Sequence, residues 1–261
     1  MKKTRTRKLS EEERLTRGEF LHFKRLITEV HPSGIISIVS DTWDFWKVVT
    51  EYLPALKSEI MNREGKVVIR PDSGDPVDIL CGYHLPGTRT FTKMTPEGKG
   101  LIECLWNTFG GTVNEKGFKV LDPHIGAIYG DSITPERAQK IVDRLIAKGF
   151  ASTNVVFGIG SYTYQYVTRD TYGMAIKATY GVVNYKPREI FKKPKTDNGG
   201  KNSAKGLLAV HWDEEHGYLL QQQATWSDVN NCAFETVFMD GLCAKGDTMA
   251  DIRTRIDSYF K

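Results

Sequence analysis

Short runs of apolar, β-branched residues alternate along this chain with polar turns and amphipathic segments, and this alternation restricts the fold more than any other feature. Near-continuous apolar runs are typical of strands in a parallel sheet that is covered on both faces. Repeated strand, turn and helix units predict an α/β fold, either a βα barrel or a doubly wound sheet. A closed barrel typically takes about eight strands. The chain offers fewer, at 35–40, 67–72, 125–130, 155–160 and 175–183.

Helical patterns separate these runs. Phe20, Phe23 and Ile27 recur at helical spacing and predict a helix over 19–30. Thr134 is a suitable N-cap with Pro135 at the first helical position, which predicts a helix over 135–149. Further helices are expected at 43–62, divided at Pro54, at 97–109 and at 161–172.

The sequence suggests three parts. Residues 1–19 form a charged leader, and the favoured interpretation is a solvated, disordered arm. The alternative is a short helix, because Ser10 and Glu13 are spaced for a capping box. Residues 20–183 carry the α/β pattern. Residues 184–261 hold a Lys-rich loop at 186–205, hairpin-like runs and a final helix from about 248.

Composition excludes several classes of protein. The net charge of +4 suits an anionic ligand such as a phosphorylated sugar, but is too small to argue for nucleic acid. The four cysteines form no CxxC pair, so we expect reduced thiols in a cytoplasmic protein. No apolar stretch is long enough for a membrane span, and no apolar segment of a secretory signal follows the basic N-terminus.

Polar residues and glycines follow four of the expected strands, where ligands gather in parallel α/β folds. Each has a structural alternative, because Asp41 can cap a helix and glycines permit tight turns. Together they predict a sugar-phosphate site. Carboxylates suit ribose hydroxyls, backbone amides at a helix N-terminus suit a phosphate, and basic side chains add charge. The candidate carboxylates are Asp72 and Asp131, the candidate backbone amides are at Gly160 and Ser161, and the candidate basic side chains are Arg169 and Lys177.

Two further patterns leave alternatives or exclude a function. Arg70 has a flat guanidinium that can stack on an aromatic base or pair with a carboxylate. Gly158-x-Gly160 lacks the third glycine and the acidic partner of a dinucleotide fingerprint, so a Rossmann dehydrogenase is rejected.

The same residues resemble a known family. The runs Val39–Asp44 (VSDTWD) and Ile69–Pro76 (IRPDSGDP), followed by Gly130-Asp131, Phe157–Gly160 (FGIG) and Thr168–Asp170 (TRD), resemble the nicotinamide phosphoribosyltransferases in order and spacing. The IRPDSG run is the most specific of them, and the resemblance extends from about residue 20 to the end.

The resemblance implies a type II phosphoribosyltransferase fold, an irregular α/β barrel of which this chain would form an incomplete part, with a small β-containing extension. It also implies a homodimer, and a reaction in NAD biosynthesis that joins nicotinamide to phosphoribosyl pyrophosphate with Mg²⁺. By carry-over, Asp41 orients a catalytic histidine and Arg70 stacks on nicotinamide. Asp72 and Asp131 would lie near the ribose, and Gly130 would be a further substrate-binding residue. The phosphate would be contacted by Gly160, Ser161 and Arg169, with Lys177 and Lys192 near the phosphates.

Three departures from the family pattern accompany the resemblance. Ile159 stands where the family has serine. The family's FKDP run is FKKP in this chain, at Phe191–Pro194. None of the six histidines has the context of the family's catalytic histidine, which lies upstream of the Asp41 strand. We therefore expect a truncated or split gene product that works with a separately encoded N-terminal half. The alternatives are a non-catalytic nucleotide- or phosphate-binding fragment, and a nucleic-acid-binding protein with basic arms, against which the mild charge argues.

Overall fold

The computed structural model describes residues 9–84, 94–130, 132–160, 165–167, 169–172, 174–197, 199 and 201–259, without the side chains of Arg169, Asp170 and Tyr259. The chain divides into two compact units. The first comprises Met1–Ile176 and Lys192–Asn202, and the second comprises Lys177–Phe191 and Ser203–Lys261.

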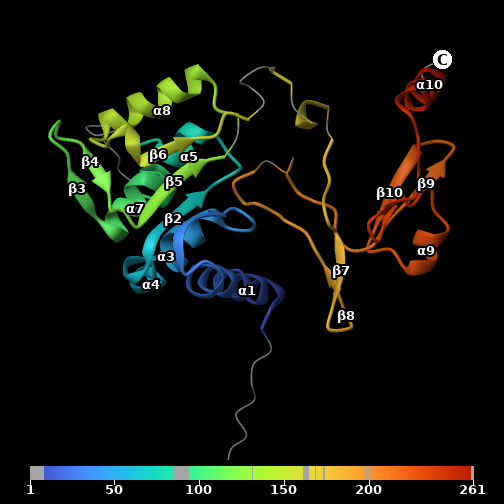
Figure 1. Cartoon of the computed structure of the whole chain (residues 1–261), viewed down its shortest axis with the longest axis horizontal. Helices are drawn as coiled ribbons and strands as arrows, with labels where there is room; N and C mark the ends of the chain where they lie inside the picture. Colours follow the sequence, from blue (N-terminus) through green and yellow to red (C-terminus); the bar gives the residue numbers. More distant parts are fainter. Residues whose placement is uncertain are drawn as a thin grey trace, which may run out of the picture. The chain divides into compact units, whose positions relative to one another are not determined.

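A parallel sheet flanked by helices forms the first unit (Figure 1). Its order is β1-β2-β5-β6, with β1 at Ser33–Val39, β2 at Glu64–Arg70, β5 at Ile125–Tyr129 and β6 at Val155–Phe157. All three strand pairs are parallel. The α/β class predicted from the sequence is therefore confirmed, and four of the five expected strands occupy this sheet with shifted ends.

The core lies between the sheet and its helices. Ile38, Ile69 and Ala127 are paired neighbours across β1, β2 and β5, and all three are buried. Helices α5 and α8 pack against one another, and α7 packs on β5. The helices of this unit are α1 (Glu11–Arg25), α2 (Phe45–Lys47), α3 (Leu53–Ala55), α4 (Lys57–Asn62), α5 (Pro76–Cys81), α6 (Pro96–Lys99), α7 (Leu101–Phe109) and α8 (Pro135–Ala147).

Helix α1 begins at Glu11, eight residues before the helix expected from 19. The Ser10 side chain accepts from the Glu13 amide at 3.1 Å, and the Glu13 carboxylate accepts from the Ser10 amide at 2.8 Å. This capping box satisfies two amides that a helix start leaves free. The favoured interpretation of a solvated arm is thus corrected from Glu11 onward, and residues 1–8 lie outside the described residues. The helix continues as a π turn, η1 (Leu26–Val30).

Two other expected helices are each divided into shorter elements, and only the first division was predicted. The helix at 43–62 becomes α2, a π turn η2 (Val48–Tyr52), α3 with Pro54, and α4. Proline has no amide to continue the ladder. The helix at 97–109 becomes α6 and α7, broken at Gly100, whose φ of +81° favours glycine. Helix α8 has the predicted Thr134 cap and Pro135 start.

Two sequence predictions are wrong. Residues 165–167 of the helix expected at 161–172 are not helical, and Arg169–Tyr172 form only a 3-10 turn, η5. This segment is rich in aromatic and β-branched residues, which lose side-chain freedom in a helix. The strand expected at 175–183 does not join the parallel sheet. Its described strand, β7 (Tyr180–Val183), forms an antiparallel hairpin with β8 (Lys186–Glu189).

The second unit consists of hairpins and short helices. Asn184 and Tyr185 have φ of +51° and +60°, the conformation of a two-residue hairpin turn between β7 and β8. The expected hairpin and final helix are confirmed as β9 (Leu208–Asp213) with β10 (Gly217–Gln222), and α10 (Met249–Tyr259). The remaining elements are α9 (Trp226–Asn230), β11 (Phe238–Met239) and β12 (Leu242–Cys243).

The first unit also holds a small hairpin of β3 (Gly111–Val113) and β4 (Lys119–Leu121), and a 3-10 turn η3 (Ser152–Asn154).

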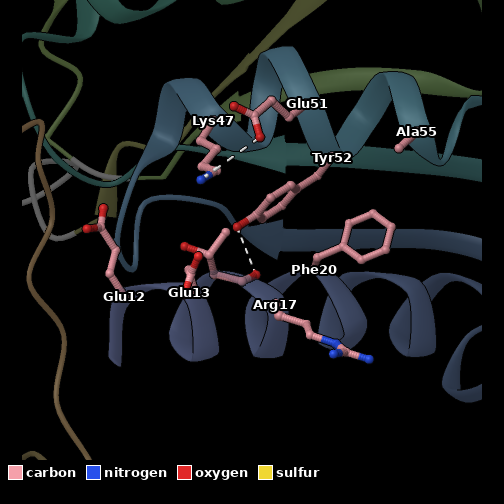
Figure 2. A pocket seen from close by; sticks show the side chains of 9 residues that line it. Glu12, Glu13, Arg17, Phe20, Lys47, Glu51, Tyr52 and Ala55 are labelled. Atoms are coloured by element: carbon pink, nitrogen blue, oxygen red, sulfur yellow. Dashed lines mark hydrogen bonds and ion pairs between the residues drawn. The ribbon is translucent and has the colours of Figure 1, made fainter. Parts of the chain in front are cut away.

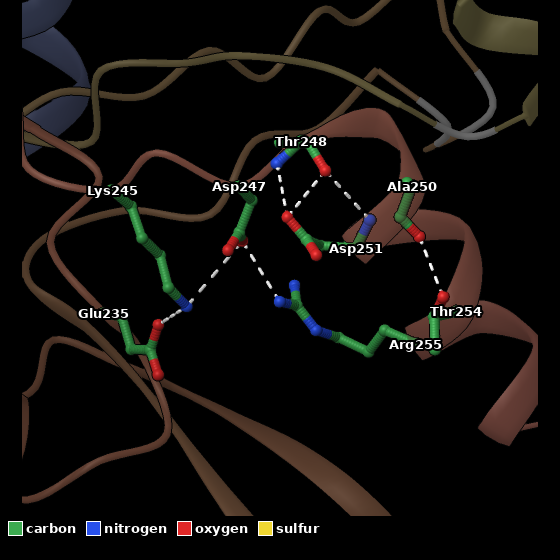
Figure 3. A network of polar contacts seen from close by, with 8 residues as sticks. All are labelled: Glu235, Lys245, Asp247, Thr248, Ala250, Asp251, Thr254 and Arg255. Atoms are coloured by element: carbon green, nitrogen blue, oxygen red, sulfur yellow. Dashed lines mark hydrogen bonds and ion pairs between the residues drawn. The ribbon is translucent and has the colours of Figure 1, made fainter.

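Polar contacts hold the start of α10 (Figure 3). Thr248 caps the helix by accepting from the Asp251 amide at 3.2 Å. Asp247 lies 3.1 Å from the Arg255 guanidinium and 4.0 Å from the Lys245 ammonium, which also contacts Glu235. Exposed pairs of this kind contribute at most about 1 kcal/mol each, so the cap sets the helix start.

All four cysteines are free thiols, as expected. Among the described residues, no helix combines the length and the apolar character needed to cross a membrane.

Asn154 generates a test of the fold. Its side chain accepts from the Leu121 amide at 2.8 Å and donates to the carbonyls of Lys119 and Ala151 at 2.9 and 3.0 Å. Asn154→Ala leaves these largely buried groups unpaired, and we expect it to lower the free energy of unfolding by about 3 kcal/mol in urea denaturation.

The matched control for this substitution is Asn62→Ala. Asn62 is exposed on α4, and its amide donates to Ser58 at 3.3 Å. We expect a change within about 0.5 kcal/mol. Equal losses in the two variants would contradict the role of Asn154 as a buried clamp between β4 and η3.

Candidate functional site

Asp41 connects the loops that follow β1 and β2. The carboxyl ends of these parallel strands lie at the same edge of the sheet, and the Ser40 amide donates to the Arg70 carbonyl at 3.0 Å. One Asp41 oxygen, Oδ2, accepts from the Asp72 amide at 3.3 Å. The side chain is 1% exposed, and its other oxygen, Oδ1, has no hydrogen-bond partner among the described residues. A buried carboxylate oxygen without a donor is costly, and it can accept from a group that enters the site.

Arg70 and Gly130 lie against one another at the ends of β2 and β5. A Cβ atom at position 130 would stand 2.3 Å from Arg70 Nε and 2.7 Å from its Cζ, which shows how closely the guanidinium approaches the backbone there. Arg70 Nε is buried and has no partner in the described part of the chain. The side chain is therefore held beside the strand end by packing on a glycine, with its planar group available to a ligand.

Gly158 extends this close packing to β6, and the sequence reasoning missed its part. A Cβ at 158 would lie 2.4 Å from the Gly130 carbonyl carbon and oxygen, and the Gly158 amide donates to the Tyr129 carbonyl at 2.8 Å. The close approach of two backbones explains why glycine occupies both positions. The two glycines of the Phe157–Gly160 run (FGIG) are the sequence signal for this close approach, although the sequence alone points to a phosphate site at Gly160.

Tyr129 lies beneath the same edge of the sheet. Its hydroxyl donates to the Gly74 carbonyl at 2.8 Å. Burial, followed by the negative charges of Asp72, Asp41 and Asp75, raises the pKa of this hydroxyl well above its usual range. Tyr129 is therefore a neutral donor that fixes the loop after β2.

A segment of the Lys-rich loop, 192–202, packs along these strand ends. The amides of Lys193 and Lys195 donate to the carbonyls of Thr42 and Trp43 at 3.1 and 2.8 Å. Ser73, which is buried, shares a hydrogen bond with Thr196. Lys192, a predicted site residue, is half-buried at the start of this segment. The contacts place several lysines beside the loops after β1 and β2.

Two of those lysines pair with aspartates at the edge of the sheet. The Lys201 ammonium contacts the Asp72 carbonyl and lies 3.4 Å from the Asp72 carboxylate. The Lys195 ammonium lies 2.8 Å from the Asp44 carboxylate. Burial alone would raise the pKa of Asp44, but hydrogen bonds from Lys195 and the Lys47 amide lower it overall. Neither Lys195 nor Lys201 was predicted, because only the folded loop brings them to these aspartates.

The structure thus brings together Asp41, Arg70, Asp72 and Gly130, while other predicted residues lie elsewhere or cannot be described. Gly160 follows β6 with a φ of +63°. Arg169 is described only by its backbone, in η5, and Lys177 belongs to the second unit. Asp131 and Ser161 lie outside the described residues.

Pockets flank this edge of the sheet. One of about 520 Å³ is lined on one side by α1 residues that include Glu19 and His22, and on the other by β1 and the following loop with Thr42 and Trp43. Another of about 310 Å³ lies beside β6, with Phe157 and Ile159 in its wall. No group of three or more His, Cys, Asp or Glu side chains in the described residues is arranged to hold a metal ion.

Comparisons with known proteins agree on one family. The model of the nicotinate phosphoribosyltransferase (NAPRTase) family matches residues 8–241. The chain is 52% identical over 92% of its length to a nicotinamide phosphoribosyltransferase of Acinetobacter baylyi, and covers 47% of that protein. Proteins of the same name from Mycoplasma pneumoniae and Xanthomonas campestris are 40% and 33% identical over 74% and 90% of the chain, which covers 43% and 47% of them. The chain spans about half the length of the curated relatives it matches.

The glycine contacts generate a test of the site's architecture. In Gly158→Ala the new methyl group meets backbone that cannot swing away, so we expect a loss of about 1–3 kcal/mol in the free energy of unfolding. In Gly130→Ala it meets the end of the Arg70 side chain, which can move, so we expect a smaller loss. Thermal unfolding of both variants measures the difference.

Gly18→Ala serves as the control for these two variants. Nothing lies within 4 Å of a Cβ at Gly18 in α1, so alanine should raise helix stability by up to about 1 kcal/mol. If Gly130→Ala destabilises the chain as much as Gly158→Ala, the guanidinium is not free to move.

Proposed function

The chain belongs to the nicotinate phosphoribosyltransferase family, and we propose that it forms the phosphoribosyl-binding part of a nicotinamide phosphoribosyltransferase. The reaction joins nicotinamide to phosphoribosyl pyrophosphate, with nicotinamide mononucleotide and pyrophosphate as products, in NAD biosynthesis. The observation that carries the proposal is the meeting of Asp41, Arg70, Asp72 and Gly130 at adjacent ends of a parallel sheet. The names of the curated relatives support the same activity.

We assign the base and ribose to the groups at the ends of β2 and β5. The Arg70 guanidinium, packed on Gly130, offers a planar cation on which the nicotinamide ring stacks. Asp72 accepts from ribose hydroxyls, and Asp131 is proposed beside it on the family resemblance. Asp41 fixes the tautomer of a catalytic histidine, and its Oδ1 is the oxygen that takes the imidazole N–H.

The phosphate contacts are proposed on the family resemblance. Gly160 and Ser161 would supply backbone amides, and Arg169, Lys177 and Lys192 would supply positive charge. The ammonium groups of Lys195 and Lys201 lie at the same edge of the sheet, held by Asp44 and Asp72. Ligand phosphates would exchange for those carboxylates.

Mg²⁺ would enter this site with its substrate. The donor set fits that mode of binding, because Mg²⁺ commonly keeps several waters and takes one or two carboxylates together with substrate phosphates. Asp72 is a partly exposed carboxylate at this edge, beside the proposed ribose, and it would be the one to assist. When bound, the ion neutralises part of the charge on the diphosphate leaving group.

We further propose that the sheet belongs to an incomplete irregular barrel, completed by a separately encoded N-terminal half in a homodimer-like assembly. Among the described strands, β1 pairs only with β2, so its outer edge offers unpaired backbone groups to another strand. The match to about half of each relative supports this assembly. The second half would supply the catalytic histidine.

Binding by this chain alone tests the proposed site. We expect Asp72→Ala to weaken binding of nicotinamide mononucleotide at least about tenfold by isothermal titration calorimetry, because a hydrogen bond to a charged group contributes about 1.5–3 kcal/mol. The thermal midpoint should change little, since the carboxylate is partly exposed.

Asp143→Ala provides the control for that variant, because Asp143 lies on α8 and its carboxylate accepts from the exposed Gln139 amide at 2.7 Å. It should bind as the unmodified chain does. A large loss of thermal stability in Asp72→Ala would instead favour a structural role for Asp72.

Turnover tests the division of the enzyme. The purified chain, given nicotinamide, phosphoribosyl pyrophosphate and Mg²⁺, should form little mononucleotide, and addition of the N-terminal half of a relative should restore activity. Robust turnover by the chain alone would contradict the need for a second half. Binding without turnover under both conditions would favour a non-catalytic nucleotide-binding protein.

A further inference from the structure

Glu19 is a half-buried residue on α1 that the proposed site does not use. Its Oε1 is buried and has no hydrogen-bond partner among the described residues. Its Oε2 lies 3.3 Å from the Tyr52 hydroxyl oxygen, on η2. The side chain therefore faces the segment that follows the Asp41 loop, across the contact between α1 and η2. An ionised carboxylate at such a place lacks the donors that usually compensate its burial.

The Tyr52 hydroxyl lies within reach of two acceptors, the Thr16 carbonyl and the Glu19 carboxyl. The hydroxyl oxygen lies 3.0 Å from the Thr16 carbonyl, which can only accept, and Figure 2 shows Tyr52 reaching from its helix toward α1. A tyrosine hydroxyl has one hydrogen. If that hydrogen goes to the nearer acceptor, Thr16, the tyrosine oxygen accepts from Glu19, and this second bond needs a protonated carboxyl.

The surrounding charges act in the same direction. Burial is the largest cause that raises the pKa of Glu19, to about 7, and the carboxylates of Asp44 and Asp41 raise it further. A hydrogen bond from Tyr52 and the positive charge of Lys47 oppose the shift. The other charged or titratable groups on the facing elements are Arg14 and His22 of α1, which line the same pocket as Glu19, Glu51 of η2, and Lys195, which pairs with Asp44.

We propose that Glu19 is a positioning residue, which in its protonated form fastens α1 to η2 beside the Asp41 loop and in its ionised form loosens this contact. When Glu19 is neutral, it adds no second negative charge near Asp41. Its proton also completes the hydrogen bonds that run from Thr16 through Tyr52 to Glu19. Ionised Glu19 repels Asp41 and Asp44 and leaves its buried Oε1 unpaired. The link from Asp41 to a catalytic histidine rests on the proposed function, whereas the fastening of α1 does not.

The sign of the pH effect follows from the direction of the shift. The folded chain binds the Glu19 proton more tightly than the unfolded chain, whose ordinary value is near 4.5. The stabilising contribution is complete below that value, and it is lost as the pH rises toward 7. Local opening of α1 that exposes Glu19 should therefore become about tenfold more favourable between pH 6 and pH 8.

Amide hydrogen exchange of the whole chain tests this inference. After correction for the intrinsic effect of pH, protection of the α1 amides should fall about tenfold from pH 6 to pH 8 in the unmodified chain. In Glu19→Gln, which stays neutral and can still donate to Tyr52, the fall should disappear. Glu11→Gln, at an exposed position of the same helix, should behave as the unmodified chain.

Direct titration of the carboxyl provides a second measurement that needs no variant. Carbon-13 NMR of the Glu19 side chain should give a pKa above about 6, and a value near the ordinary 4.5 would overturn the inference. Equal pH dependence of α1 exchange in the unmodified chain and in Glu19→Gln would also overturn it. Mononucleotide binding separates the two proposals. A chain that binds no nucleotide can still show the expected pH profile of α1 exchange, and a chain that binds nucleotide can lack this profile.

Discussion

The contact of bare backbone at Gly130 and Gly158 sets the positions of the strand ends. Any side chain at 158 would stand 2.4 Å from the Gly130 carbonyl, and any at 130 would meet the Arg70 guanidinium. β2, β5 and β6 therefore end close together, and Arg70 lies where a ligand at the edge of the sheet can reach it. The loops that carry Asp41 and Asp72 are tied to the same edge, because the Asp41 carboxylate accepts from the Asp72 amide.

This arrangement leaves buried polar atoms without partners, which a fold selected only for stability would avoid. Asp41 Oδ1 and Arg70 Nε are both buried and unpaired within the described residues, and both belong to groups proposed to meet the substrate or a histidine. Unpaired buried groups cost about 1–3 kcal/mol each. Such costs are typical of sites where a ligand or a partner supplies the missing hydrogen bond.

Local patterns predicted much of this fold, and long-range contacts account for what was missed. The Thr134-Pro135 start of α8 and the four parallel strands follow from short stretches of sequence. The apolar run ending in β7 looked the same as those strands, because periodicity does not reveal the pairing partner. Lys201 and Asp72 are 129 residues apart, and Glu19 stood in a segment interpreted as solvated, so neither contact has a local signal.

The lysines bear on how an edge rich in carboxylates would receive the proposed phosphate. Lys195 and Lys201 are held by Asp44 and Asp72, and all four side chains are at least a quarter exposed. Exposed ion pairs contribute at most about 1 kcal/mol each, so an arriving phosphate that takes these cations loses little stability and releases Asp72 for a ribose hydroxyl. Glu19 differs, because its Oε1 is buried without a hydrogen-bond partner among the described residues, and the proposed protonation removes a charge that this position lacks the donors to stabilise.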